Sequence, residues 1–448
     1  MRIIVISSRH HPGQGGVGAC IDAFVRGMAT VGWEVDLVTR QSEHLPPATR
    51  IHLVATPDDE AAFRARIPAL RRIERIRPYR YGQWALAAAE RLRQIDGPVD
   101  AVIAVDVQAE GYVAMRSRLV RQRFPGTPFL VAAHCPMFVI ESVAGAEETR
   151  HGRAIYHAWE RAALAAADGV VALSGLLGSA IAPAVPRGSI GAIPPVVPTH
   201  DRPPRSVHEP EIILIGDVAW HKGVDVWARS LNRVFRQVKD VRARLIGPDT
   251  PQAPGDRSLA AHVASLIDPR YRHRFRWDGP VHHAAALDAI DRAALIVVPS
   301  RFDSFSCVAA EAVLRRQPLV ISDRVGIGEW IAGLPTVTAG QSEALAEAQI
   351  GVLRESATWR LRLDEPRRRL LAIAAPDRVA EGYQAAIESA RQRSRTPDGG
   401  GGTDAMDDMR AFLADVEREE HRAGAVVEPA SEGASAPVEV GQGNFTTA

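Results

Sequence analysis

The chain has 448 residues, 46% of them hydrophobic and 24% charged, which suits two or three soluble globular domains. Its 54 basic and 53 acidic side chains leave a net charge of +1, so nucleic acid is not expected as a partner. The three cysteines, Cys20, Cys135 and Cys307, are too few and too scattered in the sequence for a disulfide framework or a zinc site. We therefore expect no metal and a reducing, cytoplasmic location, without a signal peptide or membrane span.

Short β-branched runs alternate with longer helical stretches along the first half of the chain. The helical stretches cover 17–31, 82–94 and 149–166. This alternation is typical of a parallel α/β sheet with helices on both faces. The expected strands lie at 3–7, 34–40, 51–55, 99–105, 129–133 and 169–173.

The second half of the chain repeats this pattern. Its expected strands lie at 211–217, 243–247, 275–279, 295–300 and 318–322. A proline-rich stretch between the halves can continue neither helix nor central strand, which indicates a linker. The fold class is therefore α/β, with two Rossmann-like domains facing a cleft. We expect domain one at 1–198, a linker at 199–210, domain two at 211–375, a closing helix at 376–394 and a flexible tail at 395–448.

A glycine-rich segment, GQGGVG, occupies Gly13–Gly18 between the first strand and its helix. Glycines let a backbone approach a ligand closely, and a helix N-terminus presents free N–H groups to an anion. The spacing also fits the G-x-G-x-x-G of dinucleotide sites. However, Ser7–Pro12 separate it from the strand, and Asp36 lies inside its own strand. A tight turn without a ligand is the third interpretation.

The segment IGDVAWHKG places Lys222 after the first strand of domain two. A lysine at the carboxyl edge of a strand can neutralise the charge that grows on a leaving diphosphate. A solvated lysine before a helix is the alternative.

The richest segment runs from Pro299 to Glu329. Asp303 lies in a loop after a strand, and Glu311 follows on the next helix with seven residues between them. Carboxylates accept hydrogen bonds from sugar and ribose hydroxyls, and the N–H groups that open the helix would face a phosphate. The alternative is a helix-capping acid and a surface glutamate.

These three segments, in this order, resemble the retaining GT-B glycosyltransferases of family 4, over nearly all of residues 1–393. The resemblance implies a metal-independent transferase that needs no cofactor and takes a UDP- or GDP-linked sugar as donor. It implies a glycan, lipid-linked or small-molecule acceptor, as in polysaccharide biosynthesis. Two alternatives stay open: a degenerate, non-catalytic sugar-nucleotide-binding protein, and an NAD(P)-dependent oxidoreductase that rests on Gly13–Gly18 alone.

By the same resemblance, His134 lies near the reacting sugar carbon and Lys222 holds the diphosphate; a lone histidine at a strand end is more often structural. Asp303 would hold sugar hydroxyls and Glu311 the ribose. Glu329 matches a family position whose role stays open. The remaining donor-binding residues implied are Gly15, Gly16, Phe305, Ser306 and Cys307.

The sequence also departs from the family pattern. Asp217 stands where the family has a diphosphate-binding arginine, so it must turn away or pair with a cation such as Lys222 if the protein is active. Asp303 replaces a glutamate. The other departures are Pro195 in place of an asparagine-glycine pair, and Ser304, Ser306 and Arg316 in place of glycines.

Seven arginines crowd residues 64–80 and are followed by Trp84. A basic surface bearing an aromatic side chain would suit an anionic lipid-linked acceptor, or peripheral contact of residues 64–84 with the inner face of a membrane. A solvated arginine-rich helix is the alternative.

Overall fold

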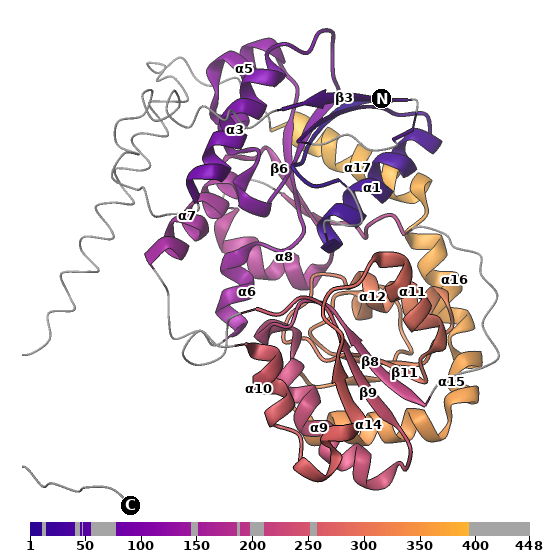
Figure 1. Ribbon diagram of the computed structural model, residues 1–448. Coiled ribbons are helices and arrows are strands. Elements are labelled where there is room, and N and C mark those ends of the chain that lie inside the picture. Colours follow the sequence, from indigo (N-terminus) through magenta and orange to yellow (C-terminus); the bar gives the residue numbers. More distant parts are fainter. Residues whose placement is uncertain are drawn as a thin grey trace, which may run out of the picture.

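The computed structural model describes residues 1–10, 15–40, 45–46, 48–54, 78–144, 151–185, 189–197, 210–250 and 258–393. Within these ranges the chain forms two parallel sheets, each covered by helices on both faces (Figure 1). The predicted α/β class is confirmed. Most of the expected linker and the whole expected tail lie outside the described residues.

The first sheet has the strand order β3-β2-β1-β4-β5-β6-β7 among the described residues, with parallel pairing throughout. Every residue of the central strands β4 and β5 is buried, because helices cover both faces of a parallel sheet. The strands are β1 (Arg2–Ile6), β2 (Glu34–Thr39), β3 (Thr49–Leu53), β4 (Ala101–Val105), β5 (Phe129–Ala133), β6 (Gly169–Ala172) and β7 (Ile190–Ala192).

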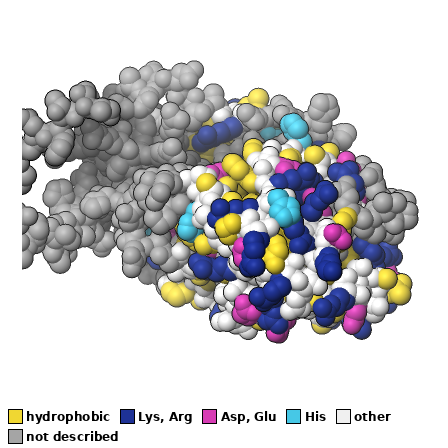
Figure 2. Space-filling view, turned by 60° about the horizontal axis from the view of Figure 1, so that its bottom comes forward, with side chains coloured by type: hydrophobic (Ala, Val, Ile, Leu, Met, Phe, Trp, Pro, Cys, Tyr) yellow, Lys and Arg dark blue, Asp and Glu magenta, His cyan; other side chains and the backbone are white. Residues whose placement is uncertain are grey.

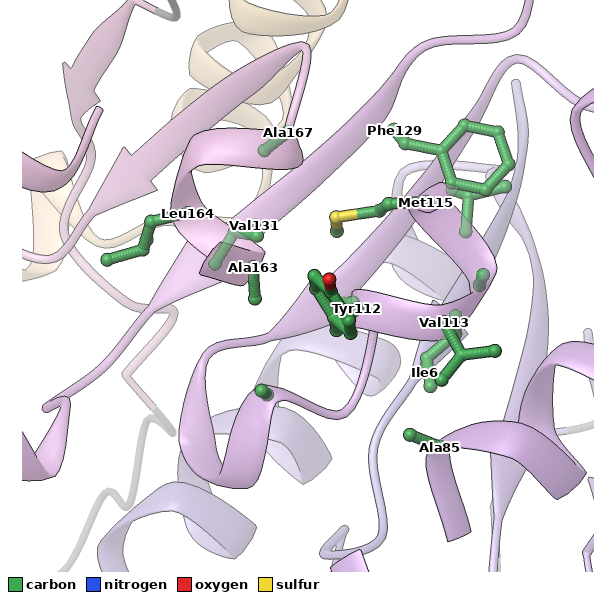
Figure 3. Close-up of a cluster of buried hydrophobic side chains, with 14 of the residues drawn as sticks. Ile6, Ala85, Tyr112, Val113, Met115, Phe129, Val131, Ala163, Leu164 and Ala167 are labelled. Carbon is green, nitrogen blue, oxygen red and sulfur yellow. The ribbon is translucent and has the colours of Figure 1, made fainter. Parts of the chain in front are cut away.

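Helices of the first domain pack a large apolar core against this sheet. Figure 3 shows part of it, where Tyr112, Met115 and Phe129 lie together with aliphatic side chains from neighbouring elements. The helices are α1 (Gly15–Thr30), α3 (Pro78–Leu92), η3 (Val107–Ala109), α4 (Tyr112–Arg116), α5 (Arg118–Arg123), α6 (Met137–Ala144), α7 (His151–Ala166), α8 (Gly175–Ile181) and η4 (Ala182–Ala184).

The second sheet has the strand order β10-β9-β8-β11-β12-β13 among the described residues, which is the doubly wound order of a Rossmann-like domain. Ligands of such sheets bind beyond the carboxyl ends of the strands. The strands are β8 (Glu211–Ile215), β9 (Arg242–Ile246), β10 (Phe275–Trp277), β11 (Leu295–Val298), β12 (Leu319–Ser322) and β13 (Thr336–Val337).

Helix α9 (Val224–Gln237) shows how the second domain is held together. Its buried apolar residues recur at helical spacing, as in Trp227, Leu231 and Val234, and they face the sheet. The other helices are η5 (Trp220–Lys222), α10 (Leu259–Ser265), η6 (Pro269–Arg274), α11 (His283–Arg292), α12 (Cys307–Leu314), α13 (Ile327–Trp330), α14 (Ser342–Arg354), α15 (Ser356–Arg362), α16 (Asp364–Ile373) and α17 (Pro376–Arg391).

The two domains contact each other in several places. Helix α17 crosses back to the first domain, where the ring of Tyr383 packs at an angle of 49° against that of Phe24 on α1, with centroids 4.8 Å apart (Figure 1). Phe302, which follows β11, is buried in the core of the first domain. The indole N–H of Trp330 donates to the carbonyl oxygen of Leu173 at 2.9 Å. The carboxyl ends of the two sheets therefore share one boundary.

Every strand that the sequence predicts is present in the structure, and two short strands, β7 and β13, were not predicted. The exposed aromatic expected near residue 84 is wrong. Trp84 is only 1% exposed, because it lies on the apolar face of α3 in the domain core. Residues 64–77 of that arginine-rich segment lie outside the described residues.

The surface of the second domain mixes charges. On the face shown in Figure 2, basic side chains are interspersed with acidic and apolar ones, as the near-zero net charge predicts. Among the described residues, no helix is long and apolar enough to cross a membrane.

Candidate functional site

Lys222 and Asp303 form an ion pair at the carboxyl edge of the second sheet. The ammonium of Lys222, at the end of η5, donates to Oδ2 of Asp303 at 2.8 Å. Burial opposes the charge on Lys222, but the attraction and hydrogen bond of Asp303 outweigh it and raise the pKa of the ammonium above its ordinary value. Lys222 therefore stays protonated at neutral pH.

Gly223 fixes the position of this lysine. Its φ of +69° is a left-handed conformation, and a Cβ there would lie 2.1 Å from the carbonyl oxygen of Pro299. Only glycine lets the backbone of η5 approach the end of β11 so closely. The guanidinium of Arg301 completes the contact by binding both oxygens of Asp225 on α9, at 2.7 and 2.9 Å.

Helix α12 begins beside the ion pair. Ser306 is its N-cap, and its Oγ accepts from the N–H of Ala309 at 3.3 Å. Phe305 is buried beneath this turn, and Cys307 is the first helical residue. The first N–H groups of a helix have no intrahelical acceptor, so this terminus favours an anion.

Glu311 lies on the second turn of α12 and is paired with a residue that the sequence did not single out. Nε2 of His283, on α11, lies 2.7 Å from Oε1 of Glu311. The hydrogen bond to Glu311 raises the pKa of His283 despite its partial burial. His283 carried no sequence signal because this contact is purely tertiary.

His134 follows β5 in the first domain and is 6% exposed. Asp106, at the end of β4, accepts the backbone N–H groups of His134 and Cys135 at 2.8 and 3.1 Å. Burial opposes protonation of the imidazole, but Asp106 outweighs it and raises the pKa of His134. Asp106 was missed, although its place after a predicted strand was a usable signal.

Gly15 and Gly16 open helix α1, whose N-terminus follows the first strand of the first domain. Both are exposed, and a Cβ on either would meet open space. Gly15 has a φ of +87°, which favours glycine for conformational reasons alone. Residues 11–14 of the glycine-rich segment lie outside the described residues.

Side chains of the two domains meet at this boundary. The charges of Lys222 and Asp303 both act on the thiol of Cys135, the neighbour of His134. Sγ of Cys20, on α1, lies 3.6 Å from Sγ of Cys307, on α12. The segment that contains His134 therefore lies near Lys222 and Asp303, and two of the three cysteines that looked scattered in the sequence are in contact.

Three of the departures from the family pattern have local explanations. Asp217 is exposed, while Lys222 pairs with Asp303 instead. Ser306 and Arg316, which replace glycines, have φ values of +76° and +52°. Arg316 ends α12 in a Schellman motif, because its N–H donates to the carbonyl of Val313 and the next N–H to that of Ala312. Both positions thus keep the backbone that glycine favours.

Asp36 bears on the dinucleotide alternative. Its carboxylate is fully buried and accepts from Arg2, Arg50 and His52 at 2.8, 3.0 and 2.7 Å. Burial opposes ionisation, but these hydrogen bonds outweigh it and lower the pKa of Asp36 to about 2. The acid on the second strand is therefore committed to internal ion pairs.

Two Rossmann-like domains with a shared boundary define the GT-B class of fold. Sucrose-phosphate synthase from Thermosynechococcus elongatus has this fold, with a TM-score of 0.65 and 20% identity over 88% of this chain and 100% of that one. Anabaena HepE, solved with UDP and glucose, has a TM-score of 0.59 and 13% identity over 87% of this chain and 100% of its own.

Residues 4–392 match the family described as Family 4 Glycosyltransferase in conflict systems, and the chain belongs to that family. It is also 28% identical to the glycogen synthase of Mycobacterium tuberculosis over 194 residues, 42% of this chain and 44% of that protein. The alpha-D-kanosaminyltransferase of Streptomyces kanamyceticus is 28% identical over 123 residues, 27% of this chain and 30% of that enzyme. The chain thus matches less than half the length of either relative.

Proposed function

We propose that the protein is a retaining glycosyltransferase that moves a sugar from a UDP- or GDP-linked donor to a glycan, lipid-linked or small-molecule acceptor without a metal ion. The observation that carries this proposal is the half-buried ammonium of Lys222, which lies 2.8 Å from Asp303 in the loop that precedes α12. A fixed cation and free helix N–H groups are what a departing diphosphate requires.

The two carboxylates of the site suit the rest of such a donor. Asp303 lies in the loop before α12, and Glu311 lies within that helix. Each carboxylate is paired with a cationic or protonatable group. On binding, the diphosphate takes over Lys222, which frees Asp303 to accept from the sugar hydroxyls. Glu311, which pairs with His283 at 2.7 Å, accepts from the ribose hydroxyls. Phe305, Ser306 and Cys307 form the wall over the phosphates.

The first domain supplies the acceptor side. His134, fixed by Asp106, lies near the reacting carbon, and Gly15 and Gly16 leave space beside the phosphates. The bond from the sugar carbon to the phosphate breaks while the bond to the acceptor oxygen forms on the same face. The leaving phosphate oxygen takes the acceptor proton, so neither a metal nor a protein base is required.

Two structural relatives support a nucleotide-sugar donor. One is HepE, solved with UDP, and another, from Escherichia coli, is bound with UDP-2-fluoro glucose. Their likeness to this chain is one of fold, at 14% and 13% identity. The donor class therefore rests on Lys222 and α12, and the relatives add a precedent for UDP-linked ligands on this fold.

Thermal-shift titration with UDP, GDP and NAD(P), all in EDTA, tests this proposal. Because a ligand stabilises only the state that it binds, UDP or GDP at about 100 times its Kd should stabilise the protein by about 2.7 kcal/mol. Stabilisation by NAD(P) alone would make the protein an oxidoreductase. A requirement for a divalent metal would contradict the metal-free mechanism.

A second candidate, a non-catalytic sugar-nucleotide-binding protein, is favoured by the aspartate at position 217. Asp217→Arg restores the family charge and separates the two candidates. For a transferase weakened by Asp217, this change should tighten nucleoside diphosphate binding by about tenfold per 1.4 kcal/mol gained. If neither form bound any nucleoside diphosphate, the nucleotide-sugar assignment would fail.

A further inference from the structure

The side chains of Cys20 and Cys307 touch each other where the two domains meet beside the proposed donor site. Cys20 lies on α1 of the first domain and Cys307 opens α12 of the second, 287 residues later. Their sulfur atoms are 3.6 Å apart, and both thiols are free. A disulfide needs an approach to about 2.05 Å, which is a small movement for two contacting domains.

The surroundings divide the two thiols into a nucleophile and its partner. The hydrogen bond from Cys307, together with the positive charge of His134, lowers the pKa of Cys20 despite its burial. The same contact and burial raise the pKa of Cys307. Cys20 is therefore the more acidic thiol of the pair, and we take it as the attacking sulfur.

A small cavity adjoins the thiol of Cys20. Cys20 and His134 line one cavity, whose other walls include Phe24, Val105 and Tyr383. Cys307, which contacts Cys20, is itself half-buried and not enclosed. The pair thus combines a nucleophilic sulfur, a resolving thiol within contact distance and an adjacent cavity, which together are typical of an oxidisable site.

We propose that Cys20 and Cys307 form a reversible disulfide that ties the two domains together when a peroxide reaches the cavity. The Cys20 thiolate attacks one peroxide oxygen, the O–O bond breaks, and the released hydroxide takes a proton to become water. Cys307 then attacks the sulfur of the Cys20 sulfenic acid, the S–S bond forms, and its thiol proton leaves with the hydroxyl as a second water. A dithiol reductant reverses the reaction by exchange.

The functional consequence rests on the proposed function. Cys307 provides one of the first N–H groups of α12, which would hold the donor diphosphate. A covalent link to α1 fixes that turn against the first domain and prevents the boundary from opening for donor entry. Oxidation should therefore weaken nucleoside diphosphate binding by about tenfold or more, and reduction should restore it.

The test compares the full-length wild type with Cys20→Ser and, as a matched control, Cys135→Ser. Each is treated with hydrogen peroxide, alkylated and digested, and the cross-linked peptides are mapped by mass spectrometry. Wild type and Cys135→Ser should yield the Cys20–Cys307 peptide, and Cys20→Ser should not. UDP and GDP binding is measured by calorimetry before oxidation, after oxidation and after dithiothreitol. Binding should fall and then recover in the wild type and in Cys135→Ser, but it should not change in Cys20→Ser.

Two outcomes would overturn the inference. One is oxidation that leaves both thiols uncross-linked, as sulfinic acids or as links to Cys135. The other is a mapped Cys20–Cys307 disulfide that leaves nucleotide binding unchanged, which would remove the regulatory consequence. Failure of the proposed function has a different signature, since the reduced wild type would then bind no nucleoside diphosphate at all.

Discussion

Lys222→Ala should lower sugar transfer by about 10²–10³-fold, which corresponds to about 2–4 kcal/mol of transition-state stabilisation. The ammonium is held by Asp303 in the loop before α12, so its loss should leave the departing diphosphate without its fixed cation. Ground-state donor binding should weaken less than turnover, because the charge on the phosphate grows as the bond breaks.

The chain itself offers a matched control for this variant. Only two of its 54 basic side chains are lysines, and the other, Lys239, is exposed beyond α9. Lys239→Ala should therefore transfer sugar at the parent rate. Nearly all basic side chains of this protein are arginines, whereas residue 222 is a lysine, whose compact ammonium fits beside Asp303. Transfer by Lys222→Ala at the rate of the control would show that the diphosphate role is wrong.

Gly223→Ala should strongly destabilise the second domain and disrupt the loop that holds Lys222. The new Cβ would require a left-handed backbone, at about 1–2 kcal/mol, and would overlap the carbonyl oxygen of Pro299, at about 1–3 kcal/mol more. The free energy of unfolding should fall by about 2–5 kcal/mol. Because Gly223 follows Lys222 directly, nucleotide binding should fail before the domain unfolds.

Gly340→Ala separates backbone strain from collision. Gly340 has a φ of +82°, but a Cβ there would meet nothing within 4 Å. The substitution should therefore lower the free energy of unfolding only by the backbone strain, about 1–2 kcal/mol, and leave nucleotide binding intact. Thermal or denaturant unfolding measures the loss of stability in both Gly223→Ala and Gly340→Ala. Equal destabilisation by the two substitutions would mean that the contact with Pro299 does not fix the lysine loop.

The strands could be predicted because parallel sheets buried on both faces consist of short, continuous apolar runs. Strands β7 and β13 were not predicted because Ile190–Ala192 and Thr336–Val337 are too short to form such a run. Trp84 was misplaced because the arginines before it suggested a surface, whereas its position on the apolar face of α3 decides its burial.

The sequence indicated residues of the candidate site only where a local motif contained them. Lys222, Asp303 and Glu311 lie in short segments whose order in the chain is informative. The partners of these residues were not predictable, since the contacts of His283 with Glu311 and of Cys20 with Cys307 depend on tertiary packing between distant segments. Asp106 lies outside any motif but could have been found from the sequence, because ligands of such sheets bind at the carboxyl ends of the strands.

The most direct test of the central claim is to follow donor cleavage by proton NMR with the wild-type protein in EDTA. A set of α-linked UDP- and GDP-sugars is offered with candidate acceptors, or with water alone for slow hydrolysis. A retaining, metal-free transferase should release the nucleoside diphosphate and give the α-anomer as the first product. A β-anomer formed first, or turnover that stops in EDTA, would contradict the mechanism, and cleavage of no donor despite nucleotide binding would contradict transfer itself.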